Sequence, residues 1–201
     1  MKRLFFTVVL VVWFIPYRLI AVESTCTTTV NPDDASVQSA VNAAKDGDVI
    51  CLKAGNVTYN AGVGLGQKAV EIRGAGSLVS PWGSAAQTII HLGNEGIAFS
   101  GWESTGHSTV IDNIQFTYGV GSAVPNFGVI TWNRQSGGKP WIIHHNDFQV
   151  TGRDDRPVFI ETGALGGLIY RNRFTAQAVA PPYINTNIEA VMQNITDDGS
   201  W

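Results

Sequence analysis

The sequence predicts an all-β chain that winds into stacked parallel coils, a solenoid, with one helix capping its N-terminal end. Three segments of similar sequence recur along the chain, as expected of a repeat architecture. Twenty-two glycines against two methionines, together with many Thr, Asn, Val and Ile residues, favour turns and strands over helices. Helical periodicity is confined to one stretch near the N-terminus, which is why a single helix is expected.

The predicted helix covers residues 35–44. From Val37 its apolar residues recur at i, i+3, i+4 and i+7, and Asp33 or Asp34 can cap its start. A turn at residues 46–48 ends this helix. Short β-rich runs bounded by glycine follow at residues 49–52, 70–72 and 88–90.

The repeat consists of three segments that align without gaps, residues 110–116, 142–148 and 168–174. Each begins with two aliphatic residues and has phenylalanine at its seventh place, and Asn146 and Asn172 share the fifth place. A further strand is predicted before each segment, at residues 97–99, 129–132 and 158–161, so that a unit of about 30 residues holds two strands. Units this small bury their apolar faces only by stacking. We therefore expect the phenylalanines in one continuous core and the two asparagines in a ladder at the turns.

The N-terminus has the order of a secretory signal, with Lys2 and Arg3 followed by an apolar run. We predict a signal peptide over residues 1–22 and one solenoid domain over residues 23–201. An uncleaved anchor is the alternative, although Arg18 lies inside the stretch that would have to span the bilayer. The expected location is therefore secreted, periplasmic or at the cell surface, with no stable membrane span after cleavage.

The number and positions of the cysteines are consistent with export to an oxidising compartment. Cys26 and Cys51 are the two cysteines of the chain, and we expect them to form a disulfide, with two free buried thiols as the alternative. The sequons that begin at Asn56 and Asn194 matter only in a eukaryotic host. Because a fourth unit begins near residue 190 and the chain stops at Trp201 without a capping element, we expect further coils beyond this sequence.

The charge of the chain bears on its partners. The net charge is −3, and no cluster of Lys and Arg follows the predicted signal. A nucleic-acid binder would carry such a cluster, so we expect no nucleic-acid partner. We expect instead a monomer whose partner is a polysaccharide.

Candidate site residues come from the alternation of side chains along a strand. If the first and seventh places of the repeat point inward, the second, fourth and sixth point outward. The outward polar columns are then Asn113, His145 and Arg171, and Gln115, Asp147 and Arg173. Arginine offers bidentate bonds to the carboxylates of an acidic sugar chain, Trp132 could stack on a pyranose ring, and Glu161 could add a carboxylate.

Two chemistries fit these residues. β-Elimination needs a base and a positive charge that stabilises the enolate-like intermediate, for which His145, Arg171 and Arg173 are candidates. Hydrolysis needs two carboxylates, and Asp147 with Asp154 or Asp155 is the best pair. The structural alternative is a salt bridge between Asp147 and Arg173 across units.

Cofactors are not determined by the sequence. Oxygen ligands from Asp147, Asp154 and Asp155 would suit calcium, but two adjacent aspartates form no recognisable metal motif, and no metal ligands are assigned. The histidines lack the spacing of a metal site. His144 is expected to point inward beside Tyr170 as a core residue.

Residues 35–55, ASVQSAVNAAKDGDVICLKAG, resemble the N-terminal cap and first strand of pectin-lyase-like β-helix proteins, and IIHHNDF and LIYRNRF resemble their repeated unit. The resemblance implies a right-handed parallel β-helix. The superfamily includes polysaccharide lyases, glycoside hydrolases, epimerases, adhesins and phage tailspikes, so the fold does not choose among them.

Two local similarities are incomplete. Residues 141–148 are similar to a pectate-lyase strand that carries Trp-Ile-Asp-His, but Ile143 replaces the aspartate. Asp154 and Asp155 are similar to the paired aspartates of polygalacturonases, but no Gly-His-Gly or Arg-Ile-Lys follows. We therefore expect an enzyme acting on acidic polysaccharide, lyase or hydrolase, with a non-catalytic glycan-binding, adhesin-type or structural β-helix as the alternative.

Overall fold

The computed structural model describes residues 25–76, 87–93, 97–102, 104, 106–118, 129–133, 138–150, 158–160, 167–176 and 185–186. This part of the chain contains helix α1 (Asp34–Ala43) near its start. Its strands are β1 (Thr28–Val30), β2 (Val49–Leu52), β3 (Gly55–Tyr59), β4 (Val63–Gly66), β5 (Glu71–Arg73), β6 (Thr88–Leu92), β7 (Phe99–Trp102), β8 (Val110–Asp112), β9 (Gln115–Tyr118), β10 (Ile130–Asn133), β11 (Trp141–His144), β12 (Asp147–Val150), β13 (Val158–Ile160), β14 (Gly167–Tyr170), β15 (Arg173–Ala176) and β16 (Asn185–Thr186).

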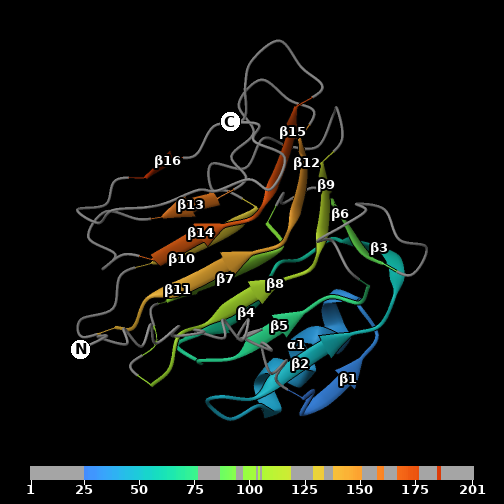
Figure 1. The fold of residues 1–201 in the computed structure, drawn as a ribbon. Coiled ribbons are helices and arrows are strands. Elements are labelled where there is room, and N and C mark those ends of the chain that lie inside the picture. Colours follow the sequence, from blue (N-terminus) through green and yellow to red (C-terminus); the bar gives the residue numbers. More distant parts are fainter. Residues whose placement is uncertain are drawn as a thin grey trace, which may run out of the picture.

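The strands form three parallel sheets (Figure 1). Sheet A has the order β1-β2-β5-β8-β11-β14, sheet B has β3-β6-β9-β12-β15, and sheet C has β4-β7-β10-β13-β16. From β2 onward the chain enters A, then B, then C, and then returns to A beside its previous strand. The prediction of a mostly β chain with parallel pairing is confirmed. The prediction of two strands in each unit is wrong, because each unit contributes one strand to each of three sheets.

Helix α1 covers the N-terminal end of the sheets, where it packs against β1, β2 and β4 (Figure 1). Its buried face carries Val37 and Val41, as the periodicity predicts. Of the two possible caps, Asp33 is the one used, and its carboxylate accepts a hydrogen bond from the backbone N–H of Ser36. At the other end the ammonium of Lys68 donates to three backbone carbonyls within 2.6–2.9 Å, which satisfies groups that a helix C-terminus leaves open.

A column of aromatic rings fills the interior. Tyr59, Phe99 and Phe116 meet edge to face with ring centroids 6.1 Å apart, and Phe116 stacks on Phe148 at 5.0 Å. These rings are fully buried together with aliphatic residues of all three sheets. The predicted phenylalanine core is confirmed for Phe116 and Phe148.

The three repeat segments stack in the predicted register. Val110, Ile142 and Leu168 are direct partners at the first place, and Phe116, Phe148 and Phe174 are partners at the seventh. Each segment is nevertheless two strands, one in sheet A and one in sheet B. The break falls at the fourth place, where Asn113, His145 and Arg171 all have positive φ, at 61°, 52° and 52°. This left-handed residue turns the chain from one sheet into the next.

The turn changes which places face inward. Ile111, Ile143 and Ile169 at the second place are buried, whereas Leu168 at the first place is 39% exposed. The prediction that the first place points inward and the second outward is therefore wrong. A continuous alternation would hold only if the segment were one uninterrupted strand.

The predicted asparagine ladder is confirmed. Asn146 and Asn172 are completely buried, and the amide nitrogen of Asn146 donates to the side-chain oxygen of Asn172 at 3.1 Å. The oxygen of Asn146 in turn accepts from the backbone N–H of Ile114 at 3.1 Å. Each side chain therefore satisfies backbone groups of its own turn and of the turn before it.

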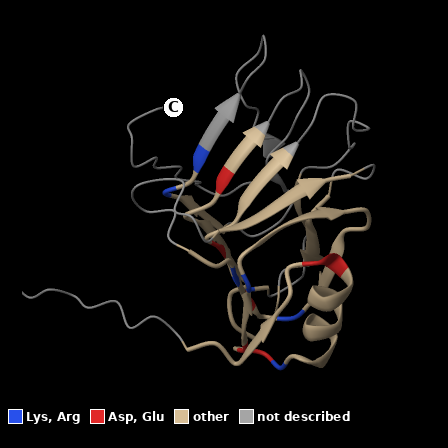
Figure 2. Ribbon diagram, turned by 90° about the vertical axis from the view of Figure 1, so that its right-hand side faces the viewer, with Lys and Arg blue, Asp and Glu red and all other residues tan. Residues whose placement is uncertain are grey.

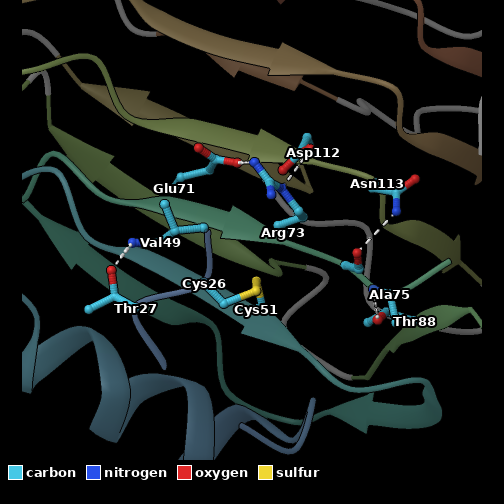
Figure 3. Close-up of a disulfide and its surroundings, with 11 residues drawn as sticks. Cys26, Thr27, Val49, Cys51, Glu71, Arg73, Ala75, Thr88, Asp112 and Asn113 are labelled. Carbon is cyan, nitrogen blue, oxygen red and sulfur yellow. Dashed lines mark hydrogen bonds and ion pairs between the residues drawn. A yellow bond between two sulfur atoms is a disulfide. The ribbon is translucent and has the colours of Figure 1, made fainter. Parts of the chain in front are cut away.

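The disulfide is also confirmed. Cys26 and Cys51 are bonded, with their Cα atoms 5.7 Å apart, which joins the segment before β1 to strand β2 (Figure 3). In the described part of the chain, no helix has the length and apolar character needed to cross a membrane. The predicted signal peptide and the predicted fourth unit lie outside the described residues.

Candidate functional site

The outward face of sheet A carries two columns of side chains across β8, β11 and β14. One column is apolar and contains Val110, Ile142 and Leu168; the next contains Asp112, His144 and Tyr170. Beside the second column lies the turn column of Asn113, His145 and Arg171. We use the term A–B corner for six residues: Asp112, Asn113, His144, His145, Tyr170 and Arg171.

His144 lies at the centre of this corner. Its ring stacks on that of Tyr170 in the next strand, with centroids 4.9 Å apart and planes 28° apart. Its Nδ1 lies 2.7 Å from Nδ1 of His145, so one imidazole donates a proton to the other. The predicted contact with Tyr170 is confirmed. The inward orientation is wrong, because His144 is only half-buried and belongs to the outward column.

Burial first, and then the neighbouring His145, Arg73 and Arg171, together lower the pKa of His144 to about 4. The imidazole of His144 is therefore neutral at neutral pH. Burial raises the pKa of Tyr170 more than the nearby charge of Arg171 lowers it, and Asp112 raises it further, so its phenol keeps its proton. Both shifts follow from placing ionisable rings against each other on a partly covered surface.

Arg73 continues the Asp112 column toward the N-terminal end (Figure 3). Its guanidinium contacts the carboxylate of Glu71 on its own strand and lies 3.5 Å from the carboxylate of Asp112 on the next. Both acids are largely covered and in contact with a cation. Sequence reasoning assigned no role to these residues, because Glu71 and Arg73 lie outside the aligned segments.

Arg171 is the exposed cation of the corner. It follows Tyr170 directly and occupies the left-handed place above His145. Asn113 occupies the same place at the preceding turn, where its amide donates to the carbonyl oxygens of Gly74 and Gly76. The predicted column of Asn113, His145 and Arg171 is thus brought together, with its side chains at least partly accessible.

Asp147 is closed to solvent. Its side chain is 1% exposed, and its two oxygens accept from Nε of Arg173 at 2.9 Å and from the terminal nitrogen of Arg173 at 2.5 Å. Gln149 donates to the same carboxylate at 2.9 Å. This basic and acidic pair lies side by side at the start of neighbouring strands β15 and β12 (Figure 2). The structural alternative for these two residues, a salt bridge across units, is confirmed.

Trp132 cannot stack on a sugar ring in this structure. The side chain is 1% exposed and packs in the core beside Trp141, with ring centroids 6.5 Å apart. The prediction for this residue is wrong, because its position on β10 faces inward. The exposed tryptophan of the described residues is Trp102 at the end of β7, with 46% of its surface accessible. No pattern in the sequence distinguishes the two.

Three predicted site residues, Asp154, Asp155 and Glu161, lie outside the described residues. Within the described ranges, no group of three His, Cys, Asp or Glu residues is arranged to hold a metal ion. The calcium hypothesis also used Asp147, whose carboxylate is bound by Arg173.

A separate cavity of about 620 Å³ lies between β1 and α1. Its walls carry small hydroxyl and methyl side chains, among them Thr28, Ser36, Ser39 and Ala40. It contains none of the residues predicted for the site. The corner and this cavity are therefore separate features of the surface.

The A–B corner joins a pair of imidazoles, of which that of His144 is neutral, a protonated phenol and an exposed guanidinium. Such a set can bind a carboxylate and transfer protons next to it. Comparison of the chain with protein-family models, with curated proteins and with solved structures found no match. The function is therefore inferred from the chemistry of the corner.

Proposed function

We propose that the chain is an exported right-handed parallel β-helix protein of the pectin-lyase-like class that acts on an acidic polysaccharide at the A–B corner. The cyclic order of sheets A, B and C supports the helical winding. Crossover connections between parallel strands of one sheet are right-handed in nearly all proteins, which supports the hand. The disulfide between Cys26 and Cys51 is typical of exported chains.

The observation that carries the proposal is the exposed Arg171 beside His145 and Tyr170. A guanidinium binds a carboxylate through two parallel hydrogen bonds and stays charged at every relevant pH. The ring of Tyr170 lies 5.9 Å from that of His145, centroid to centroid. A uronate whose carboxylate pairs with Arg171 would therefore lie next to an imidazole and a phenol.

β-Elimination is the reaction that these groups fit best. A base removes the proton on the carbon beside the carboxylate, the glycosidic C–O bond breaks, and the leaving oxygen receives a proton. In this proposal His145 is the base and Tyr170 the proton donor. Arg171 neutralises the carboxylate, which lowers the energy of the enolate-like intermediate.

Hydrolysis has less support at this corner. It requires two accessible carboxylates on opposite sides of the glycosidic bond. Among the described residues near the corner, Glu71 and Asp112 flank Arg73, and Asp147 is buried by Arg173. The corner therefore offers positive charge and proton-transfer groups more readily than a pair of acids.

The test is an assay of the purified chain on polyuronates and on neutral polysaccharides, with and without calcium. Absorbance of unsaturated uronates reports elimination, and reducing ends without that absorbance report hydrolysis. Replacing Arg171 with Asn keeps a residue that tolerates positive φ, as Asn113 does in the same column, and removes the charge. Loss of one charged hydrogen bond of about 1.5–3 kcal/mol predicts a fall in kcat/KM of roughly 10- to 100-fold.

The matched control is Lys139→Asn, which removes an exposed positive charge elsewhere. This variant should keep full activity. Binding of polyuronate without any product would favour the non-catalytic glycan-binding alternative. If no polyuronate is bound or cleaved, the proposal is wrong.

A further inference from the structure

The segment Asn56-Val57-Thr58 in β3 has the pattern of an N-glycosylation acceptor. Asn56 and Thr58 are exposed, whereas Val57 is half-buried and Tyr59 is buried. Because side chains alternate along a strand, the amide of Asn56 and the hydroxyl of Thr58 point to the same outward face. The folded chain thus presents both functional groups of the acceptor to solvent.

The position of β3 leaves room for a large substituent. β3 is the terminal strand of sheet B, so only one of its edges is paired within the sheet. That edge pairs with β6, where Asn56 lies opposite Ile89. A substituent on the outward face of the first strand extends away from the stack and displaces no core side chain. Exposed terminal strands also invite edge-to-edge association, and a bulky hydrophilic group blocks it.

We propose that Asn56 is an N-glycosylation site that is filled when the chain passes through a eukaryotic secretory pathway. The donor is an oligosaccharide carried on a lipid pyrophosphate. The side-chain nitrogen of Asn56 forms a C–N bond to the anomeric carbon of that sugar, the anomeric C–O bond breaks, the lipid pyrophosphate leaves, and the amide loses one proton. The hydroxyl of Thr58 completes the acceptor pattern.

The attachment point of the glycan lies apart from the A–B corner. Within sheet B, β6 and β9 separate β3 from β12 and β15, the strands that follow His145 and Arg171. The site is therefore independent of the proposed activity and shares with it only the need for export. The disulfide between Cys26 and Cys51 fits that requirement.

The experiment expresses the full chain in secreting eukaryotic cells and treats total and secreted protein with peptide-N-glycosidase. An Asn194→Gln background removes the other sequon. Against it, Asn56→Gln and Thr58→Ala should each abolish the mobility shift, and Thr58→Ser should retain it. Peptide mapping of the deglycosylated protein should show the Asn56 amide converted to aspartate.

Failure of export must be separated from failure of transfer. Translation in the presence of microsomes, followed by protease protection, identifies the chains that reached the lumen, and only these are scored. Protected chains with the expected disulfide and a modified Asn56 support the proposal. An unmodified Asn56 peptide in protected, disulfide-bonded chains would overturn it.

Discussion

His144 links the geometry of the corner to the stability of the fold. The folded-state pKa of His144 is about 4, because of burial first and then of His145, Arg73 and Arg171, whereas an unfolded histidine titrates near about 6.5. At pH values between these two pKa values, His144 is protonated in the unfolded chain and neutral in the folded chain. The stability of the native state should therefore fall as the pH drops from about 6.5 to about 4, by at most about 3 kcal/mol from this group.

The measurement is urea unfolding of wild type and His144→Phe across this range of pH. Phenylalanine keeps a ring against Tyr170 and removes the titrating group. The variant should lose part of the acid-induced decrease in the free energy of unfolding. An identical pH dependence in both proteins would show that His144 does not titrate as its surroundings imply.

Asp147 should stabilise the fold rather than act in catalysis. Its buried carboxylate binds Arg173 through two hydrogen bonds and also accepts from Gln149. Asp147→Asn leaves the guanidinium without its counter-charge. We expect a loss of about 1–3 kcal/mol in the free energy of unfolding, measured by urea denaturation.

Arg171→Asn is the control for Asp147, because it removes a charge from the exposed turn column. That variant should change stability by less than about 0.5 kcal/mol. The structural role of Asp147 is refuted if its replacement by Asn leaves stability intact and removes activity.

At the residue scale, the sequence shows which residue types a site could use more clearly than it shows which way their side chains point. Trp132 and Trp102 both stand in predicted or actual strands of sheet C, but one is in the core and the other is exposed. Register along β7 and β10 decides this, and it depends on pairing with strands distant in the sequence. The pairing of Asp147 with Arg173 could be predicted because both hold the sixth place of aligned repeats.

At the scale of elements, the disulfide fastens the terminal strand β1 to the stack. Cys26 and Cys51 are 25 residues apart, and closing a loop of this length in the unfolded chain is worth about 3 kcal/mol. A double Cys26→Ser, Cys51→Ser variant should lose about this much stability in urea unfolding. Reductant should lower the free energy of unfolding of wild type by a similar amount and leave that of the variant unchanged. Equal stability of wild type and variant without reductant would contradict this role.

The asparagine ladder is the second feature at this scale that stabilises the stack. Asn146 donates to the carbonyl oxygen of His144 in its own turn and to that of Ile111 in the turn before it, and accepts from the backbone N–H of Ile114. Replacing Asn146 with Ala leaves these backbone groups without partners. We expect a loss of about 2–4 kcal/mol, since each buried unsatisfied group costs about 1–3 kcal/mol.

The comparison for Asn146→Ala is Asn113→Ala. Asn113 is half-buried at the turn column, and its replacement should cost less in the same urea titration. Equal costs for both substitutions would show that burial in the ladder adds nothing.

The elements themselves follow from the sequence to different degrees. Helix α1 was predictable because its apolar spacing and its cap residue are local signals. The division of each repeat into β8 and β9, or β11 and β12, was not, because its signal is one residue with positive φ. Asn113 and His145 belong to residue types that are enriched at positive φ, but Arg171 does not, so residue type alone does not mark the turn in all three segments.

At the scale of the molecule, stacking of equivalent positions creates both the core and the surface. Phe116 on Phe148 and Asn146 on Asn172 are inward columns, and the same register brings His144 onto Tyr170 outside. Such register was readable from three aligned segments. The function was not, because an outward column serves binding and catalysis equally well, and only the accessibility of each side chain separates Arg171 from Asp147.

The most direct test of the central claim is a titration of the ¹⁵N-labelled chain with a polyuronate oligosaccharide, followed by NMR of backbone amides and histidine rings. The claim predicts saturable shifts concentrated at His145, Tyr170 and Arg171, and their loss in Arg171→Asn. Saturable shifts confined to other surfaces, such as β1 and α1, would contradict it. So would the absence of any shift at oligosaccharide concentrations where full-length polyuronate binds.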